Sequence, residues 1–279
     1  MKAKKDKTSI CSICQWHGVS PQSYYKYLRV ERKSMYEEEV LLEMVRERRK
    51  ELRFEGYVKL YDTLKPQIKA HGFKIGRDKF RMFLKAHDLH IKRKKKYVNT
   101  TNSLHRYRVY ENLIKGMKVS RINEVWVSDI TYIRVGKGFM YLSLITDLYS
   151  RKIVGHHLSH SLAKEGCIKA LRMALGQRKD KTLGLIHHSD RGFQYCSHAY
   201  VNILKSNNAE ISMAAKGNCY ENATAERVNG ILKEEFQLDS TFPGEKVAQK
   251  AVRQSITAYN ELRKHYSLNL ETPSQRHAA

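Results

Sequence analysis

The chain has 279 residues, of which 41% are hydrophobic, so it is long and apolar enough for one large domain and one or two small ones. Its formal net charge of +24, with the excess concentrated in residues 1–120, predicts a polyanionic partner, and nucleic acid is the leading candidate. No apolar run approaches the ~20 residues of a membrane span, no secretory signal is evident, and five scattered cysteines make no disulfide framework, so we expect an intracellular protein.

Residues 1–34 are predicted to form two short helices around a glycine turn. Apolar residues recur at helical spacing from Ile10 to Trp16, Gly18 interrupts the pattern, and Ser20 suits the cap of the next helix. Such a helix-turn-helix often places its second helix in the major groove of DNA. A helical hairpin that merely docks on a neighbouring unit is the alternative. In the DNA-binding interpretation, the side chains that face the groove are Gln22, Ser23, Lys26 and Arg29.

Residues 35–90 are predicted to form a three-helix DNA-binding module, with helices over about residues 36–52, 57–68 and 77–87. Apolar residues at three- and four-residue spacing supply its core. A basic linker over residues 91–120 follows, and we interpret it as a DNA contact, with passive tethering as the alternative. This linker contains a run of consecutive basic residues, which are Lys92, Arg93, Lys94, Lys95 and Lys96.

The periodicity changes at about residue 121, where β-branched and aromatic residues become frequent. Three strands joined by short turns are predicted first, followed by a helix, a strand, a short helix, a strand and a long helix. This order predicts an α/β fold with a mixed five-stranded sheet over residues 121–240, and it is the order of the ribonuclease H-like fold. Residues 241–279 are predicted to form a helix and then an extended tail. The residues of that helix that face inward are Val247, Ala251, Ile256 and Tyr259.

Three carboxylates fall on different predicted elements: Asp129 in the first strand, Asp190 at the end of the fourth, and Glu226 on the long helix. A phosphoryl-transfer site with two divalent cations needs several oxygen ligands that converge from distant elements. Most acidic residues only keep a protein soluble, and Asp190 is also suited to capping a turn. Asp129 differs, because an unpaired charge inside an apolar strand costs several kcal/mol unless a metal or another partner compensates it. Glu226 has rivals on its own helix, which are Glu221, Glu234 and Glu235.

Polar and cationic residues accompany these acids. Asn222, Asn229 and Lys233 lie at helical spacing from Glu226, so we expect a DNA backbone to contact them. Lys233 is the strongest candidate, because two helical turns place its amine on the side of the helix that carries Glu226. Arg191 is a further candidate DNA contact.

Two histidines and one turn near the acids have two interpretations. His187 and His188 precede the second acid and either order water or phosphate or are core residues, since an alternating strand would bury one of them. In the turn DLYSRK, Asp147 is interpreted as a turn acid and Arg151 as a cation that reaches phosphate.

The strings WVSDITYI, HHSDRGFQY, GNCYENATAERVNGILKEE and YNELRKHYSLNLETPSQRH together resemble bacterial insertion-sequence transposases with a retroviral-integrase-like catalytic core. The resemblance covers nearly the whole chain and is greatest to the downstream-frame product, OrfB, of two-frame elements. It implies that Asp129, Asp190 and Glu226 are a DDE triad, with the family's thirty-five residues between the last two acids. Two departures are Glu221, where Asp is more usual, and Lys264, where Pro is common.

The resemblance also implies the chemistry and the partners. Mg²⁺ or Mn²⁺, as two ions, would support in-line cleavage and strand transfer without a covalent protein–DNA intermediate. The expected partners are double-stranded DNA, as element terminal repeats and target, further copies of the chain on that DNA, and the upstream-frame product OrfA, separate or fused. The expected location is the bacterial cytoplasm, at the nucleoid when DNA is bound. A structure-selective nuclease and a non-catalytic DNA-binding regulator on the same fold are the alternatives.

Overall fold

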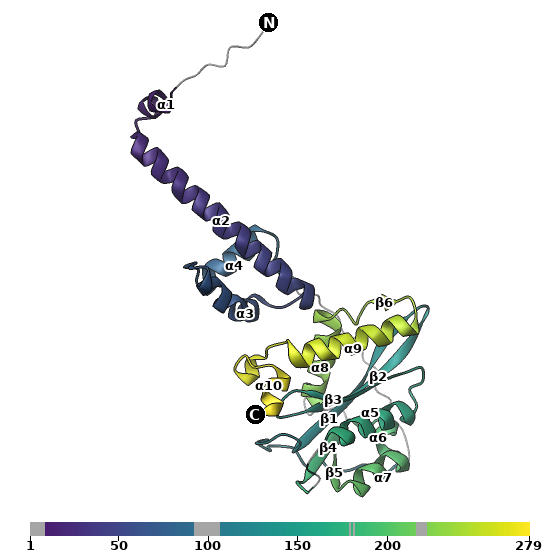
Figure 1. The fold of residues 1–279 in the computed structure, drawn as a ribbon. Coiled ribbons are helices and arrows are strands. Elements are labelled where there is room, and N and C mark those ends of the chain that lie inside the picture. The colour runs from purple at the N-terminus through teal and green to yellow at the C-terminus, as the bar shows by residue number, and fades with distance from the viewer. Residues whose placement is uncertain (1–8, 92–106, 179, 181, 216–221) are drawn as a thin grey trace.

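A computed structural model describes residues 9–91, 107–178, 180, 182–215 and 222–279 of the chain. Helices of the N-terminal part extend away from a larger α/β unit that contains the sheet (Figure 1). The predicted run of basic linker residues, Lys92, Arg93, Lys94, Lys95 and Lys96, lies outside the described residues, as does Glu221. Within the described ranges, no helix combines the length and the apolar character that crossing a membrane requires.

Two helices around a glycine turn form near the N-terminus, but the second helix is long rather than short. Helix α1 (Ile10–Trp16) is followed by a turn in which Gly18 has a φ of 64°, and helix α2 (Pro21–Glu51) begins after Ser20. The Ser20 hydroxyl accepts a hydrogen bond from the Ser23 backbone N–H at 3.1 Å, as expected of an N-cap.

Helix α2 corrects one sequence prediction. It is a single helix of 31 residues, so the helix predicted over about 36–52 is its second half and the proposed boundary between residues 34 and 35 lies inside it. The reason is local, because the sequence VERKSMYEEEV over residues 30–40 contains neither glycine nor proline to end a helix.

The second helical module has three helices. It consists of the second half of α2 with α3 (Tyr57–Ala70) and α4 (Arg77–Ala86). Its core is apolar and buried, and it is formed by Leu41, Val45, Leu60, Leu64, Ile68, Phe73, Phe80 and Leu84.

The sheet has the predicted topology. Strands β1 to β3 are antiparallel neighbours, β4 and β5 run parallel to β1, and the order is β3-β2-β1-β4-β5. The bounds are β1 (Val125–Val135), β2 (Gly138–Asp147), β3 (Ile153–Ser159), β4 (Leu185–Ser189) and β5 (Ala209–Met213). This mixed sheet, with helices following its later strands, is the ribonuclease H-like fold. A sixth strand, β6 (Thr241–Phe242), pairs with the far end of β1 and is too short for a sequence pattern to predict.

Helices cover both faces of the sheet (Figure 1). Helices α5 (Lys164–Gln177), α6 (Phe193–Cys196) and α7 (His198–Ser206) share one apolar core with Trp126 of β1. On the other face, α8 (Ala223–Glu235) and α9 (Glu245–Glu261) share a second core with Ile133. Alternating residues of β1 thus point into two different cores.

The C-terminal region departs from the prediction in two ways. Val247 is 49% exposed rather than facing inward, whereas Ile256 and Tyr259 are buried. The expected extended tail is instead a short 3₁₀ turn (Tyr266–Leu268) and helix α10 (Pro273–Ala278). A capping box explains this helix, because Thr272 and Gln275 cap its first turn and proline follows Thr272.

Candidate active site

The two aspartates are brought together by the register of two parallel strands. β1 pairs with β4 from Val125 beside Ile186 to Val127 beside His188. Continuing this register by two residues places Asp190 beside Asp129, since neighbouring parallel strands lie about 4.8 Å apart. β4 ends at residue 189, so the second acid sits at the carboxyl end of its strand while β1 continues. Ligands of open α/β sheets commonly bind at such an edge.

Helix α8 lies across the face of β1 that carries Asp129. Ala225 packs in the same apolar cluster as Val125 and Val127. One turn later, the Asn229 side-chain amide donates a hydrogen bond to Oδ2 of Asp129 at 2.7 Å. Glu226 follows Ala225 in the first turn of this helix and is exposed. The helix therefore brings the third acid to the edge where the two aspartates meet.

The pKa of Asp129 responds to its burial and to both of the other acids. Burial and then the charge of Asp190 raise the pKa of Asp129 to about 7, and Glu226 adds to the increase. Hydrogen bonds from the Ile130 backbone N–H and from Asn229 oppose this by favouring the charged carboxylate. The Asp129 carboxyl group therefore takes up a proton more readily than an ordinary aspartate does.

Asp190 also caps a turn, as one sequence interpretation expected. Its Oδ1 accepts a hydrogen bond from the Gly192 backbone N–H at 2.9 Å. A Cβ atom at Gly192 would lie 3.0 Å from that same oxygen, so the residue type here permits the close approach. The turn fixes the direction of the Asp190 carboxyl group, and a fixed carboxyl group is compatible with a role in an active site.

A divalent cation fits this donor set. Within the described ranges, no group of three or more His, Cys, Asp or Glu side chains is arranged as a ready-made metal site. Nevertheless, carboxylate oxygens are the ligands that Mg²⁺ prefers. The repulsion that raises the pKa of Asp129 is also the kind of interaction that a bound cation relieves.

Residues 119–219 and residues 207–273 each match a family described as Integrase core domain. The chain is 35% identical over 269 residues to an uncharacterized 31 kDa protein of insertion element IS600 from Shigella sonnei, and the match covers 94% of this chain and 96% of that protein. It is 34% identical over 204 residues to the transposase InsF of insertion sequence IS3fB from Escherichia coli (strain K12), covering 72% of this chain and 70% of that one. The chain belongs to the insertion-sequence transposases.

Solved structures with a similar core include the catalytic core domain of the HTLV-2 integrase in its trimeric form in complex with magnesium. That domain has 20% sequence identity to this transposase and a TM-score of 0.45, and the match covers 56% of this chain and 97% of that chain. A simian T-cell lymphotropic virus intasome chain has 19% identity and a TM-score of 0.47, with 58% of each chain covered.

The cations predicted near the acids of this transposase have different surroundings. Burial lowers the pKa of Lys233, and the charge of Asp129 opposes that effect, so the lysine lies within electrostatic reach of the site. The Arg191 Nε donates a hydrogen bond to the Ala214 carbonyl oxygen at 2.8 Å. The Arg151 guanidinium, expected to reach phosphate, donates to the Thr224 hydroxyl of α8 at 3.1 Å.

The asparagine that precedes α8 and the one within it both bind the protein itself. The Asn222 amide donates to the Ser128 carbonyl oxygen at 3.2 Å, next to Asp129, and Asn229 donates to Asp129 directly. Sequence reasoning expected both as DNA contacts and missed these internal bonds. The sequence shows that Asn229 lies at helical spacing from Glu226. It does not show that the Asn229 side chain reaches Asp129 on a distant strand.

His187 and His188 are both buried, whereas the prediction buried one of them. The reason is that β4 is a central strand with helices on both faces of the sheet. His187 Nε2 lies 2.7 Å from the Ser128 hydroxyl and 2.9 Å from the Tyr200 hydroxyl, and burial together with His188 lowers its pKa to about 3. His187 is thus a neutral core residue. Asp147 has its predicted turn role, because its carboxylate accepts hydrogen bonds from the Ser150 backbone N–H and hydroxyl at 2.7 Å each.

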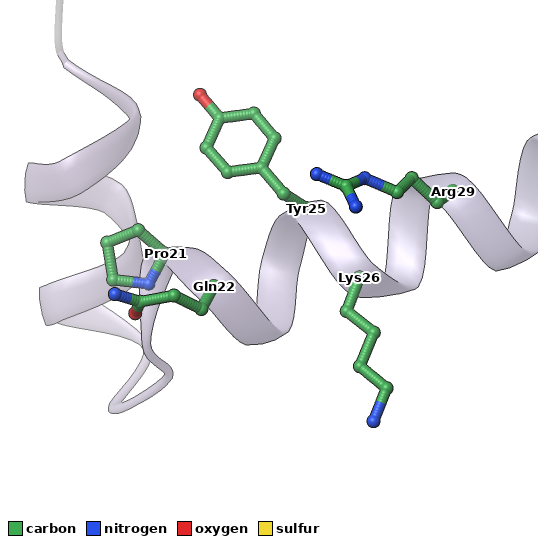
Figure 2. A pocket seen from close by; sticks show the side chains of 5 residues that line it. All are labelled: Pro21, Gln22, Tyr25, Lys26 and Arg29. Carbon is green, nitrogen blue, oxygen red and sulfur yellow. The ribbon is translucent and has the colours of Figure 1, made fainter.

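The predicted DNA-facing surface of α2 is accessible. Lys26 and Arg29 are both exposed (Figure 2). Figure 2 shows the Arg29 guanidinium directed toward Tyr25, while Lys26 extends from the other side of the helix. Tyr25 is 46% exposed. An exposed aromatic ring beside a guanidinium group is suited to contact with sugar or base, and the sequence analysis did not assign it.

Proposed function

We propose that this DNA transposase, a polynucleotidyl transferase of the DDE type, uses Asp129, Asp190 and Glu226 as its acidic triad. In this proposal it cuts the ends of an insertion sequence and joins them to target DNA. The observation that carries the assignment is the hydrogen bond from Asn229 to Asp129, because it places helix α8, with Glu226 one turn before Asn229, against the strand that carries the first acid. The parallel register of β1 and β4 supports the same grouping.

The three carboxylates would hold divalent cations, either Mg²⁺ or Mn²⁺ and as a pair. Bound there, such ions would lower the pKa of a water molecule or a DNA 3′-hydroxyl and stabilise the leaving oxygen. Glu226 is exposed in the first turn of α8, so we expect its side chain to move toward the aspartates when a cation binds. The rival acid Glu234 is exposed further along the same helix.

The remaining roles belong to residues around the triad. Asn229 and the Ile130 backbone N–H hold the Asp129 carboxylate in one orientation, which favours its charged form. Lys233 supplies a cation for a DNA phosphate beside Asp129. The reaction needs no serine, tyrosine or cysteine nucleophile, so displacement at phosphorus proceeds in line and without a covalent protein–DNA intermediate.

DNA is held outside this site as well. We assign contacts with element ends and target to the basic surface of α2, with Lys26 and Arg29, and to the basic linker. Further copies of the chain on the same DNA and an upstream-frame product, OrfA, separate or fused, complete the assembly. This assembly acts in the bacterial cytoplasm.

A cleavage and joining assay tests the proposal. Labelled element ends, unlabelled target DNA and Mg²⁺ are incubated with the protein and with Glu226→Gln, and Glu234→Gln serves as a matched control on the same helix. We expect cut and joined products from the unmodified protein and the control, and neither product from Glu226→Gln. Hydrolysis without joining would favour a nuclease, and tight binding without any metal-dependent cut would favour a regulator.

A further inference from the structure

The helical module touches the catalytic unit through a small polar junction. Lys264 follows α9, and its Nζ lies 2.6 Å from Oδ2 of Asp62 on α3. The Arg48 Nη2 at the end of α2 donates a hydrogen bond to the Leu262 carbonyl oxygen at 3.0 Å. Helices α2 and α3 of the module are thus joined to the end of α9 by charged side chains, and the buried apolar clusters of the two units are separate.

The same short segment also binds the helix that carries the third acid. Arg263, between Leu262 and Lys264, forms two hydrogen bonds with Glu235 at the end of α8, at 2.7 and 2.6 Å. Arg263 is buried, so this bidentate pair holds the segment firmly. Residues 262–264 therefore connect the helical module on one side with α8, and hence Glu226, on the other.

The ion pair between Lys264 and Asp62 is suited to positioning the helical module rather than to stabilising the fold. The side chains of Lys264 and Asp62 are 24% and 35% exposed. An ion pair with this much exposure contributes little to stability. Its geometry nevertheless fixes which part of α3 faces the end of α9. Lys264 stands where Pro is common in the family that the sequence resembles. In the structure it pairs with Asp62, 202 residues earlier in the chain.

We propose that Asp62 and Lys264 are positioning residues of the transposase, forming a latch that sets the helical module against α8. The latch makes DNA held by the module arrive at the acids in one register. This inference rests on the proposed function, because the register matters only if the module holds the DNA that the acids cut.

Charge reversal tests the latch. Asp62→Lys and Lys264→Asp each place like charges together, and the double variant restores an opposite pair. On labelled double-stranded element ends, we expect each single variant to lose cutting at the correct phosphate by roughly tenfold to a hundredfold, since small misplacements carry costs of that size. DNA affinity should stay within about twofold, because a surface ion pair of this kind carries little binding energy. The double variant should regain most of the cutting.

A matched control uses the exposed ion pair between Glu47 and Lys50, which lies within α2. Glu47→Lys with Lys50→Glu should cut like the unmodified protein. Thermal melting checks that the single variants are folded. Single variants that cut at the correct phosphate with unchanged rates, or a double variant no better than the singles, would overturn the latch.

A second measurement does not depend on activity. Small-angle scattering of the DNA-free protein should show a larger radius of gyration for each single variant and the original value for the double variant. If the unmodified protein cuts no DNA, the proposed function fails, and scattering still decides the latch. Equal radii for all four proteins would overturn it.

Discussion

The candidate active site and the N-terminal hairpin place their functional side chains in opposite ways. In the core, Asp129 lies on a central strand and is held by Asn229 and by its own backbone neighbour. On α2, Lys26 and Arg29 are exposed on a helix that extends away from the body (Figure 1). Chemistry at a phosphate needs groups held in place before the substrate arrives, whereas a grip on a polyanion needs reach and charge. The two regions should therefore respond differently to substitution.

Asp129→Asn is expected to give the largest difference between loss of cleavage and loss of DNA binding. The amide keeps the shape and can still accept the hydrogen bond from Asn229, so the fold should tolerate it, as it tolerates the neutral form of an acid whose pKa is about 7. We expect cleavage of element ends to fall by about 10³-fold or more, because a charged ligand of the proposed divalent cation is lost. Binding to the same DNA, measured by gel shift, should be unchanged. Retained metal-dependent cutting would remove Asp129 from the triad.

The reverse pattern is expected from Lys26→Glu combined with Arg29→Glu. Two phosphate contacts become repulsive, so affinity for element ends should fall by roughly a hundredfold at moderate salt, and the slope of log affinity against log salt should decrease by about two. At saturating protein, the rate of the chemical step should persist. Titrations at several salt concentrations measure both quantities.

Arg172→Glu with Lys205→Glu is the matched control for this variant, because both residues are exposed on α5 and α7 and the change in net charge is the same. We expect a much smaller loss of affinity from it. If the two double variants weaken binding equally, the hairpin has no special contact with DNA.

A smaller effect within the core is expected from Asn229→Ala. The lost hydrogen bond favoured the charged carboxylate, so its removal raises the pKa of Asp129 further. The acidic limb of the pH–rate profile should move to higher pH, with a loss of roughly tenfold at neutral pH, within the range for outer partners of metal ligands. Asn222→Ala removes a bond to a backbone carbonyl instead and should leave this limb in place. If the rate falls equally at every pH and the acidic limb does not move, Asn229 has only a structural role.

The same comparison separates what the sequence predicts from what it does not. The strands of the core were predicted because alternating and β-branched patterns are local, and the two aspartates then follow from strand order. The bond between Asn229 and Asp129 joins residues 100 positions apart, and no local pattern contains it. The exposure of Tyr25 likewise depends on what packs nearby, which periodicity alone does not state.

Two errors had local signals that were present in the sequence. The continuity of α2 through residue 34 follows from a stretch without glycine or proline. Helix α10 follows from Thr272, Pro273 and Gln275, which together make a capping box. The predicted boundary at residues 34 and 35 and the predicted extended tail were therefore wrong at positions where the local sequence favours helix.

The smallest expected effect concerns Lys59 of α3, at the junction between the helical module and the catalytic unit. Its side chain is buried, its ammonium group lies 5.3 Å from the centre of the Tyr266 ring, and burial followed by the charge of Arg263 lowers its pKa to about 8. Between this value and the unfolded value near 10.5, the unfolded chain binds more protons, so stability rises with pH over that window. Below pH 8 the full cost of burying the charged group is present.

Lys59→Met should therefore stabilise the protein at pH 7, by about 1–3 kcal/mol after allowance for the lost contact with Tyr266. The advantage should shrink as pH rises above 8 and vanish near 10.5, where the lysine is neutral in both states. Denaturant unfolding at pH 7 and pH 10 measures it, with the exposed Lys65→Met on the same helix as a control that should not depend on pH. A destabilised Lys59→Met at pH 7 would mean that the attraction of Glu55, Glu235 and the ring exceeds the cost of burial, and the junction would then depend on this charge as the active site depends on its acids.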